Sequence, residues 1–84
     1  MKWHPIFLTE EPTPGVWTMK HPTEDAPFGK IELRRVDGGL RYKVQLYGKV
    51  IGWATELSTA TERLWEAYTR DVGTRHQGPP NGGR

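Results

Sequence analysis

Hydrophobic and polar side chains alternate along residues 40–47. The apolar positions are Leu40, Tyr42, Val44 and Leu46, and the positions between them are Arg41, Lys43, Gln45 and Tyr47. A period of two residues is typical of a β-strand with one buried and one exposed face. Residues 30–36 alternate in the same way, and Ile51 and Trp53 repeat the spacing further on. The pattern predicts three strands.

An Asp-Gly pair at residues 37–38 follows the first strand. Asp-Gly is a preferred two-residue hairpin loop, because glycine accepts positive φ angles. Such a loop pairs Leu33 with Tyr42 and Ile31 with Val44. The apolar residues of both strands then lie on one face.

A Gly-Lys pair at residues 48–49 predicts the second turn, since glycine is favoured in the first position of a two-residue hairpin loop. This loop pairs Leu46 with Ile51 and Val44 with Trp53. Both predicted turns therefore place every apolar residue on the same face. The turn residues and the hydrophobic patterns of the strands thus predict the same fold, and this agreement strengthens the prediction.

Residues 57–72 have the period of an amphipathic helix. Its apolar side comprises Leu57, Ala60, Leu64, Trp65, Ala67, Tyr68 and Val72. Thr59 and Glu62 fit a capping box at the helix start, and Gly73 fits its end. We therefore expect an α+β fold, in which a three-stranded or four-stranded antiparallel sheet carries one C-terminal helix on one face.

The apolar side of this helix is expected to cover the apolar face of the sheet. The covered residues would be Ile31, Leu33, Tyr42, Val44, Leu46, Ile51 and Trp53. Trp53 and Trp65 are then predicted to be core residues, because buried aromatic side chains dominate small cores.

Residues 1–29 are rich in proline, which excludes a long helix, yet too apolar for a disordered tail. One interpretation packs this segment on the sheet, with residues 15–20 as a fourth strand beside residues 30–36. The other docks it on a partner. Residues 73–84 are rich in glycine and proline and predict a flexible tail. Residues 30–72 form the predicted core.

The 84 residues suffice for one domain, and the chain has no cysteine, which excludes a disulfide scaffold. No apolar run is as long as a membrane span, so we expect a cytoplasmic protein that contacts no membrane. The net charge of +2 is mildly basic and permits nucleic-acid binding without requiring it.

No arrangement of side chains predicts catalysis or a metal site. His4, His21 and His76 lack the spacing of metal ligands. Ser58, the only serine, stands where a helix-capping hydroxyl is expected. We therefore expect a non-enzymatic protein with no catalytic residue, no metal and no cofactor.

The sheet face opposite the helix is predicted to be basic. It carries Lys30, Arg34, Arg41, Lys43, Gln45 and Tyr47, with Lys49 at the rim. The Asp-Gly turn places Arg34 directly opposite Arg41, a like-charge pair that costs stability unless an anion or water separates the two. Duplex DNA is one candidate partner, because arginine and lysine contact its phosphates and guanine edges. The alternative is an ordinary solvated face.

A protein partner is the competing hypothesis. Trp3, Phe7 and Trp17 would contact a host protein or a second copy of the chain, because aromatic side chains are favoured at interfaces. An open sheet edge also invites the addition of a strand.

The order of three strands and a helix over residues 30–72 resembles the arm-site-binding amino-terminal domain of tyrosine-type phage integrases, whose three-stranded sheet docks in the DNA major groove. The sequence of residues 51–68, IGWATELSTATERLWEAY, is similar to sequences of small accessory proteins of actinobacterial phages. These resemblances imply a phage accessory protein in the host cytoplasm, with DNA or a host protein as its target.

Overall fold

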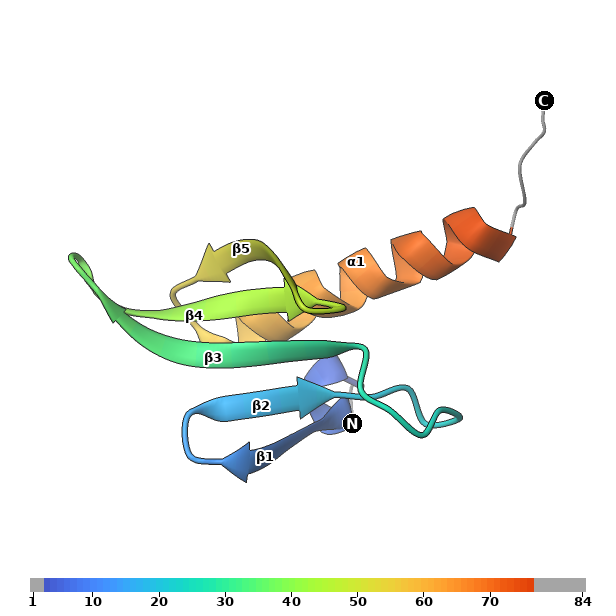
Figure 1. Cartoon of the computed structure of the whole chain (residues 1–84), viewed down its shortest axis with the longest axis horizontal. Coiled ribbons are helices and arrows are strands. Elements are labelled where there is room, and N and C mark those ends of the chain that lie inside the picture. Colours follow the sequence, from blue (N-terminus) through green and yellow to red (C-terminus); the bar gives the residue numbers. More distant parts are fainter. Residues whose placement is uncertain (1–2, 77–84) are drawn as a thin grey trace.

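The computed structural model describes residues 3–76, with side chains as far as Gly73. Five antiparallel strands form one sheet in the order β1-β2-β3-β4-β5, and one helix packs across it (Figure 1). The elements are η1 (Pro5–Leu8), β1 (Thr9–Thr13), β2 (Val16–Met19), β3 (Gly29–Val36), β4 (Gly39–Leu46), β5 (Lys49–Ala54) and α1 (Leu57–His76). The predicted α+β class with one C-terminal helix is confirmed, but the sheet has more strands than predicted.

The hairpin of β3 and β4 has the predicted register. Val36 pairs with Gly39, so that residues 37–38 form the two-residue loop. Ile31 therefore lies opposite Val44, and both are fully buried beneath the helix. The Asp-Gly turn alone was sufficient to define this pairing, because a two-residue loop fixes every later pair in the ladder.

The turn between β4 and β5 lies one residue earlier than predicted. Its loop is Tyr47-Gly48, with both residues at positive φ (52° and 81°), and it pairs Leu46 with Lys49. Further along, Val44 pairs with Gly52 and Gln45 with Val50, which leaves Ile51 as a bulged residue between them.

The displaced turn alone would keep each residue on its predicted face, so it is the bulge at Ile51 that moves Trp53 to the other face of the sheet. It pairs with Lys43, and 43% of its surface is exposed. The prediction that Trp53 is a core residue is therefore wrong, and Ile51, at 42% exposed, is not buried under the helix either. Slipping a strand by one residue exchanges its two faces.

The N-terminal segment packs on the same chain. β2 pairs with β3, which confirms the predicted fourth strand, and places Met19 fully buried in the core. β1, which contains Pro12, forms a fifth strand that was not predicted. Pro14 and Gly15 make the turn between β1 and β2, where Gly15 has a φ of 84°.

The helix begins where its apolar period begins but extends beyond its predicted end. It starts at Leu57, two residues before Thr59, and it continues through Gly73 to His76. Thr59 is therefore not the capping residue, and Gly73 does not stop the helix. The predicted tail is helical up to His76, and residues 77–84 lie outside the described part of the chain.

The core lies between α1 and the inner face of the sheet. Its buried hydrophobic residues are Met19, Phe28, Ile31, Val44, Ala54, Ala60, Leu64 and Tyr68. The ring of Phe28 stacks on Tyr68 with centroids 3.8 Å apart. Trp65 is half-buried against this core, and Leu33, Tyr42 and Leu46 are half-buried as well.

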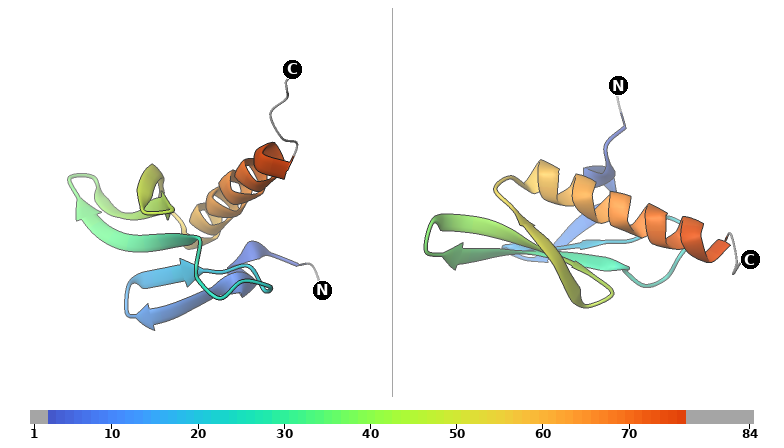
Figure 2. Two further views of the ribbon diagram at one scale, coloured as in Figure 1. Left: turned by 45° about the vertical axis from the view of Figure 1, so that its right-hand side comes forward. Right: turned by 90° about the horizontal axis from the view of Figure 1, so that it is seen from above.

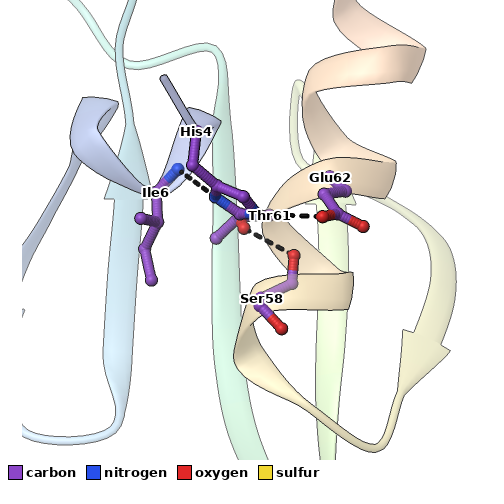
Figure 3. Close-up of polar contacts among 5 residues, drawn as sticks. All are labelled: His4, Ile6, Ser58, Thr61 and Glu62. Atoms are coloured by element: carbon purple, nitrogen blue, oxygen red, sulfur yellow. Dashed lines mark hydrogen bonds and ion pairs between the residues drawn. The ribbon is translucent and has the colours of Figure 1, made fainter. Parts of the chain in front are cut away.

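η1 is held against the helix on the same side of the sheet (Figure 2). Figure 3 shows that His4 joins the two elements: its Nδ1 accepts from the Ile6 amide at 3.1 Å, and its Nε2 lies 2.9 Å from Glu62 Oε2. Because Nδ1 accepts a hydrogen bond, the imidazole donates from Nε2. Beside it, the buried Thr61 hydroxyl donates to the Ser58 carbonyl oxygen at 2.7 Å.

Candidate nucleic-acid interface

The helix and η1 lie on one side of the sheet and leave its other face open (Figure 2). We call this open side the outer face. The strand registers place five of the predicted site residues on it: Lys30, Arg34, Arg41, Lys43 and Gln45. The sequence therefore identified the outer face of β3 and β4 correctly.

Glu32 lies between two of these cations. Its Oε1 is 3.1 Å from Lys43 Nζ, and its Oε2 is 3.2 Å from Lys30 Nζ. Lys43 and, to a lesser extent, Lys30 hold the pKa of the Glu32 carboxyl below its ordinary value of 4.5. The one carboxylate therefore balances one of the two positive charges that these lysines carry.

Arg34 and Arg41 have no such compensation. They are a directly opposed pair in the ladder, and no carboxylate in the described part of the chain forms an ion pair with either. Arg41 Nη1 donates to the Leu40 carbonyl oxygen at 2.8 Å, and a Cβ atom at Gly38 would stand 3.1 Å from Arg41 Nη2. The glycine turn therefore leaves room for the Arg41 side chain to lie over it.

The end of the β3–β4 hairpin projects beyond the rest of the sheet. β2 pairs only with residues 29–32 of β3, and β5 only with residues 42–46 of β4. The Leu33 amide still donates to the Gly15 carbonyl oxygen at 2.8 Å, so residues 34–41 form a two-stranded ribbon, seen at the left of Figure 1. Arg35 lies on the other face of this ribbon, opposite Leu40. The ribbon thus carries three arginines.

Tyr47 and Lys49, the other two predicted site residues, lie in different surroundings. Tyr47 is 55% exposed and lines a hollow of about 470 Å³ together with Thr18, Lys30 and Gln45. Lys49 pairs with Leu46, whose side chain belongs to the helix side of the sheet. The predicted place of Lys49 at the rim of the basic face is therefore wrong.

Sequence reasoning missed two apolar members of the outer face. Val50 lies opposite Gln45 and Trp53 opposite Lys43, and both are more than two-fifths exposed. Trp53 reaches this face only through the bulge at Ile51, which no turn residue signals, whereas Val50 lies on it with either position of the second turn.

The three aromatic residues of the predicted protein interface differ in exposure. Trp3 and Phe7 are exposed by 56% and 59%, although the Trp3 ring meets Trp65 edge-on at 5.5 Å. Trp17 is half-buried on the inner face, where its ring lies 5.6 Å from that of Tyr42. Trp17 therefore supports the fold.

Within residues 3–76 no helix has both the length and the apolar character to cross a membrane. In the same region no three histidine, aspartate or glutamate side chains gather closely enough to hold a metal ion. Comparisons of the chain with family models, with curated proteins and with solved structures each found no match.

Proposed function

We propose that the protein is a non-enzymatic DNA-binding protein that inserts the β3–β4 ribbon into a groove of duplex DNA. The observation that carries this proposal is the opposed pair of Arg34 and Arg41. Two adjacent guanidinium groups repel each other, and this arrangement costs stability that anionic ligands would recover. Phosphate oxygens supply such anions at regular intervals along DNA.

The shape of the ribbon supports the same partner. The major groove of B-DNA is about 12 Å wide and admits a two-stranded β-ribbon, whereas a wider sheet would not enter it. Residues 34–41 are the part of the sheet that has only two strands. Arginines on both faces of the ribbon would meet the groove floor and its phosphate walls.

The proposed DNA contacts differ in how far each cation is already paired with a carboxylate. Arg34 and Arg41 face the same way and make the central contacts, while Arg35 approaches the backbone from the other face of the ribbon. Lys43 and Lys30 contribute less, because Glu32 already pairs with both. Gln45 and Tyr47 lie further from the tip and contact DNA only where it runs along the sheet.

Binding of a labelled duplex of about 20 base pairs, roughly two helical turns, tests the proposal. We expect the double variant Arg34→Gln/Arg41→Gln to bind about tenfold more weakly or worse. Arg70→Gln removes a cation from the C-terminal half of α1, which lies away from the ribbon (Figure 1), and serves as the control. Equal binding by the wild-type protein and the double variant would contradict the proposal.

A protein partner or a second copy of this chain is the second candidate. It is favoured by the exposed apolar residues of the edge strand β5, namely Val50, Ile51 and Trp53. Arg63 Nη1 already occupies the Trp53 carbonyl oxygen at 2.9 Å, which leaves less of this edge available for strand addition. Light scattering separates the two candidates: a concentration-dependent dimer that Val50→Lys abolishes would favour the interface.

A further inference from the structure

A cavity of about 300 Å³ lies where β5 leads into α1. Its polar lining comes from Arg41 on β4, Thr55 before the helix, and Thr59 and Arg63 on the helix. Trp53 adds an aromatic wall. Cavities that bind small ligands start at about this volume and combine an apolar surface with a few convergent polar groups.

Two guanidinium groups border this cavity, and none of the described residues that line it is acidic. Each arginine is steadied by a backbone carbonyl: Arg63 Nη1 donates to the Trp53 oxygen at 2.9 Å, and Arg41 Nη1 donates to the Leu40 oxygen at 2.8 Å. A guanidinium carries five N–H donors in a fixed fork, so each arginine keeps several donors for a ligand. The ligand chemistry that this lining selects is an anion with several oxygens.

The exposed ring of Trp53 indicates a second property of the ligand. Its side chain is 43% exposed although it belongs to a protein with a small core, where burial of an indole ring would stabilise the fold considerably. Stacking on an aromatic ring is a common way of holding a nucleic-acid base and tolerates every base, because each has a π-face. The cavity thus combines anion donors with a stacking surface.

We propose that this cavity binds a single nucleotide. The phosphate lies between Arg41 and Arg63, the base stacks on Trp53, and the hydroxyls of Thr55 and Thr59 hydrogen-bond to phosphate or sugar oxygens. The ligand is either a free nucleoside monophosphate or the 5′-phosphorylated end of a DNA strand. Both present the same phosphate and base to the site.

This site goes beyond the proposed binding of duplex DNA. The two share Arg41, but Arg34 does not line the cavity, and Arg63 and Trp53 are not part of the ribbon. Arg35→Gln, which removes a ribbon arginine on the face away from Arg41, is therefore expected to weaken duplex binding without changing nucleotide binding. Arg63→Gln is expected to do the reverse, so that failure of one proposal is distinguishable from failure of the other.

The test is a titration of the full chain with deoxyadenosine monophosphate, with deoxyadenosine and with inorganic phosphate, each alone. Nuclear magnetic resonance follows the indole N–H signals, and Trp53→Phe identifies the signal of Trp53. We expect the monophosphate to shift this signal saturably, and deoxyadenosine to bind at least about tenfold more weakly because it lacks the charge-assisted hydrogen bonds. Arg63→Gln weakens monophosphate binding by a similar factor, and Arg35→Gln, on the other face of the ribbon, serves as the matched control.

A second arm compares single strands of the same sequence with and without a 5′-phosphate. Preference for the phosphorylated strand identifies a strand end as the ligand, whereas binding of the monophosphate alone identifies the free nucleotide, and either result supports the site. The proposal is overturned if the monophosphate leaves the Trp53 signal unmoved. It is equally overturned if deoxyadenosine binds as well as the monophosphate, or if Arg63→Gln binds as well as the wild-type protein.

Discussion

Arg34 on β3 lies directly opposite Arg41 on β4, on the face of the sheet that the helix leaves open. Cross-strand neighbours of like charge destabilise a sheet, and ion pairs within the described residues do not relieve this one. The fold therefore tolerates a local cost at the point where we place the DNA contacts.

Replacing one of these arginines with an acid should stabilise the protein. Arg34→Glu converts the repulsive pair into an opposite-charge pair, and we expect the free energy of unfolding to rise by about 0.5 kcal/mol at low salt. Arg35→Glu makes the same change of net charge on the other face of the ribbon, opposite Leu40, and is the control. Chemical denaturation measures both; an equal change in the two variants would show that the opposed pair carries no repulsion.

The sequence predicted this pair because the Asp-Gly loop fixes the register of β3 and β4. It did not predict the next turn. Tyr47 adopts a φ of 52°, a left-handed conformation that is unusual for a residue with a side chain, so Gly48 occupies the second position of the loop. The expectation that glycine comes first displaced the turn by one residue, and the bulge at Ile51, which the sequence did not signal, exchanged the faces of β5 beyond it.

The other differences also have local causes. The composition of β1 did not predict a strand, because proline and glutamate are depleted in strands and β1 contains Pro12 and two adjacent glutamates. β1 is an edge strand, however, and an edge strand accommodates proline on its unpaired side. Gly73 gave the pattern of a helix end, yet one glycine inside a helix costs only about 1 kcal/mol relative to alanine, and α1 continues through it. The cavity beside Trp53 was not predictable, because it depends on the corrected register of β5.

Stability at acid pH should depend on Glu32. Lys43 and Lys30 lower the pKa of this carboxyl below 4.5, so the ionised form is favoured in the folded state. Its contribution to stability is therefore present above about pH 4.5 and is lost as the pH falls through the lowered pKa. We expect Glu32→Gln to be less stable than the wild-type protein near neutral pH, with the difference disappearing in acid. Glu10→Gln on β1 is the control, and urea unfolding at a series of pH values is the measurement.

The same substitution should have the opposite effect on DNA binding. Glu32→Gln removes the acidic side chain that pairs with Lys30 and Lys43 on the outer face, and so leaves both ammonium groups available to phosphates. We expect the affinity for duplex DNA to increase several-fold while stability decreases. Unchanged or weaker binding by a folded Glu32→Gln variant would exclude these two lysines from the DNA interface.

The contact between sheet and helix is tightest at Gly29. A Cβ atom at this position would lie 2.6 Å from Leu64 Cδ1 and 2.9 Å from the Gln45 carbonyl oxygen. Gly29→Ala should therefore destabilise the protein by about 1–3 kcal/mol through overpacking. A Cβ atom at Gly52 on β5 would meet nothing within 4 Å, so Gly52→Ala should change stability by less than about 0.5 kcal/mol. Thermal and urea unfolding test this contrast, which similar values for the two variants would contradict.

The salt dependence of duplex binding tests the central claim most directly. Each cation that contacts a DNA phosphate adds about −0.9 to the slope of the logarithm of the binding constant against the logarithm of the salt concentration. Between about 50 and 200 mM salt, we predict that Arg34→Gln/Arg41→Gln makes this slope shallower by about 1.8, whereas Arg70→Gln leaves it unchanged. A double variant with the slope of the wild-type protein would show that the opposed arginines do not contact DNA.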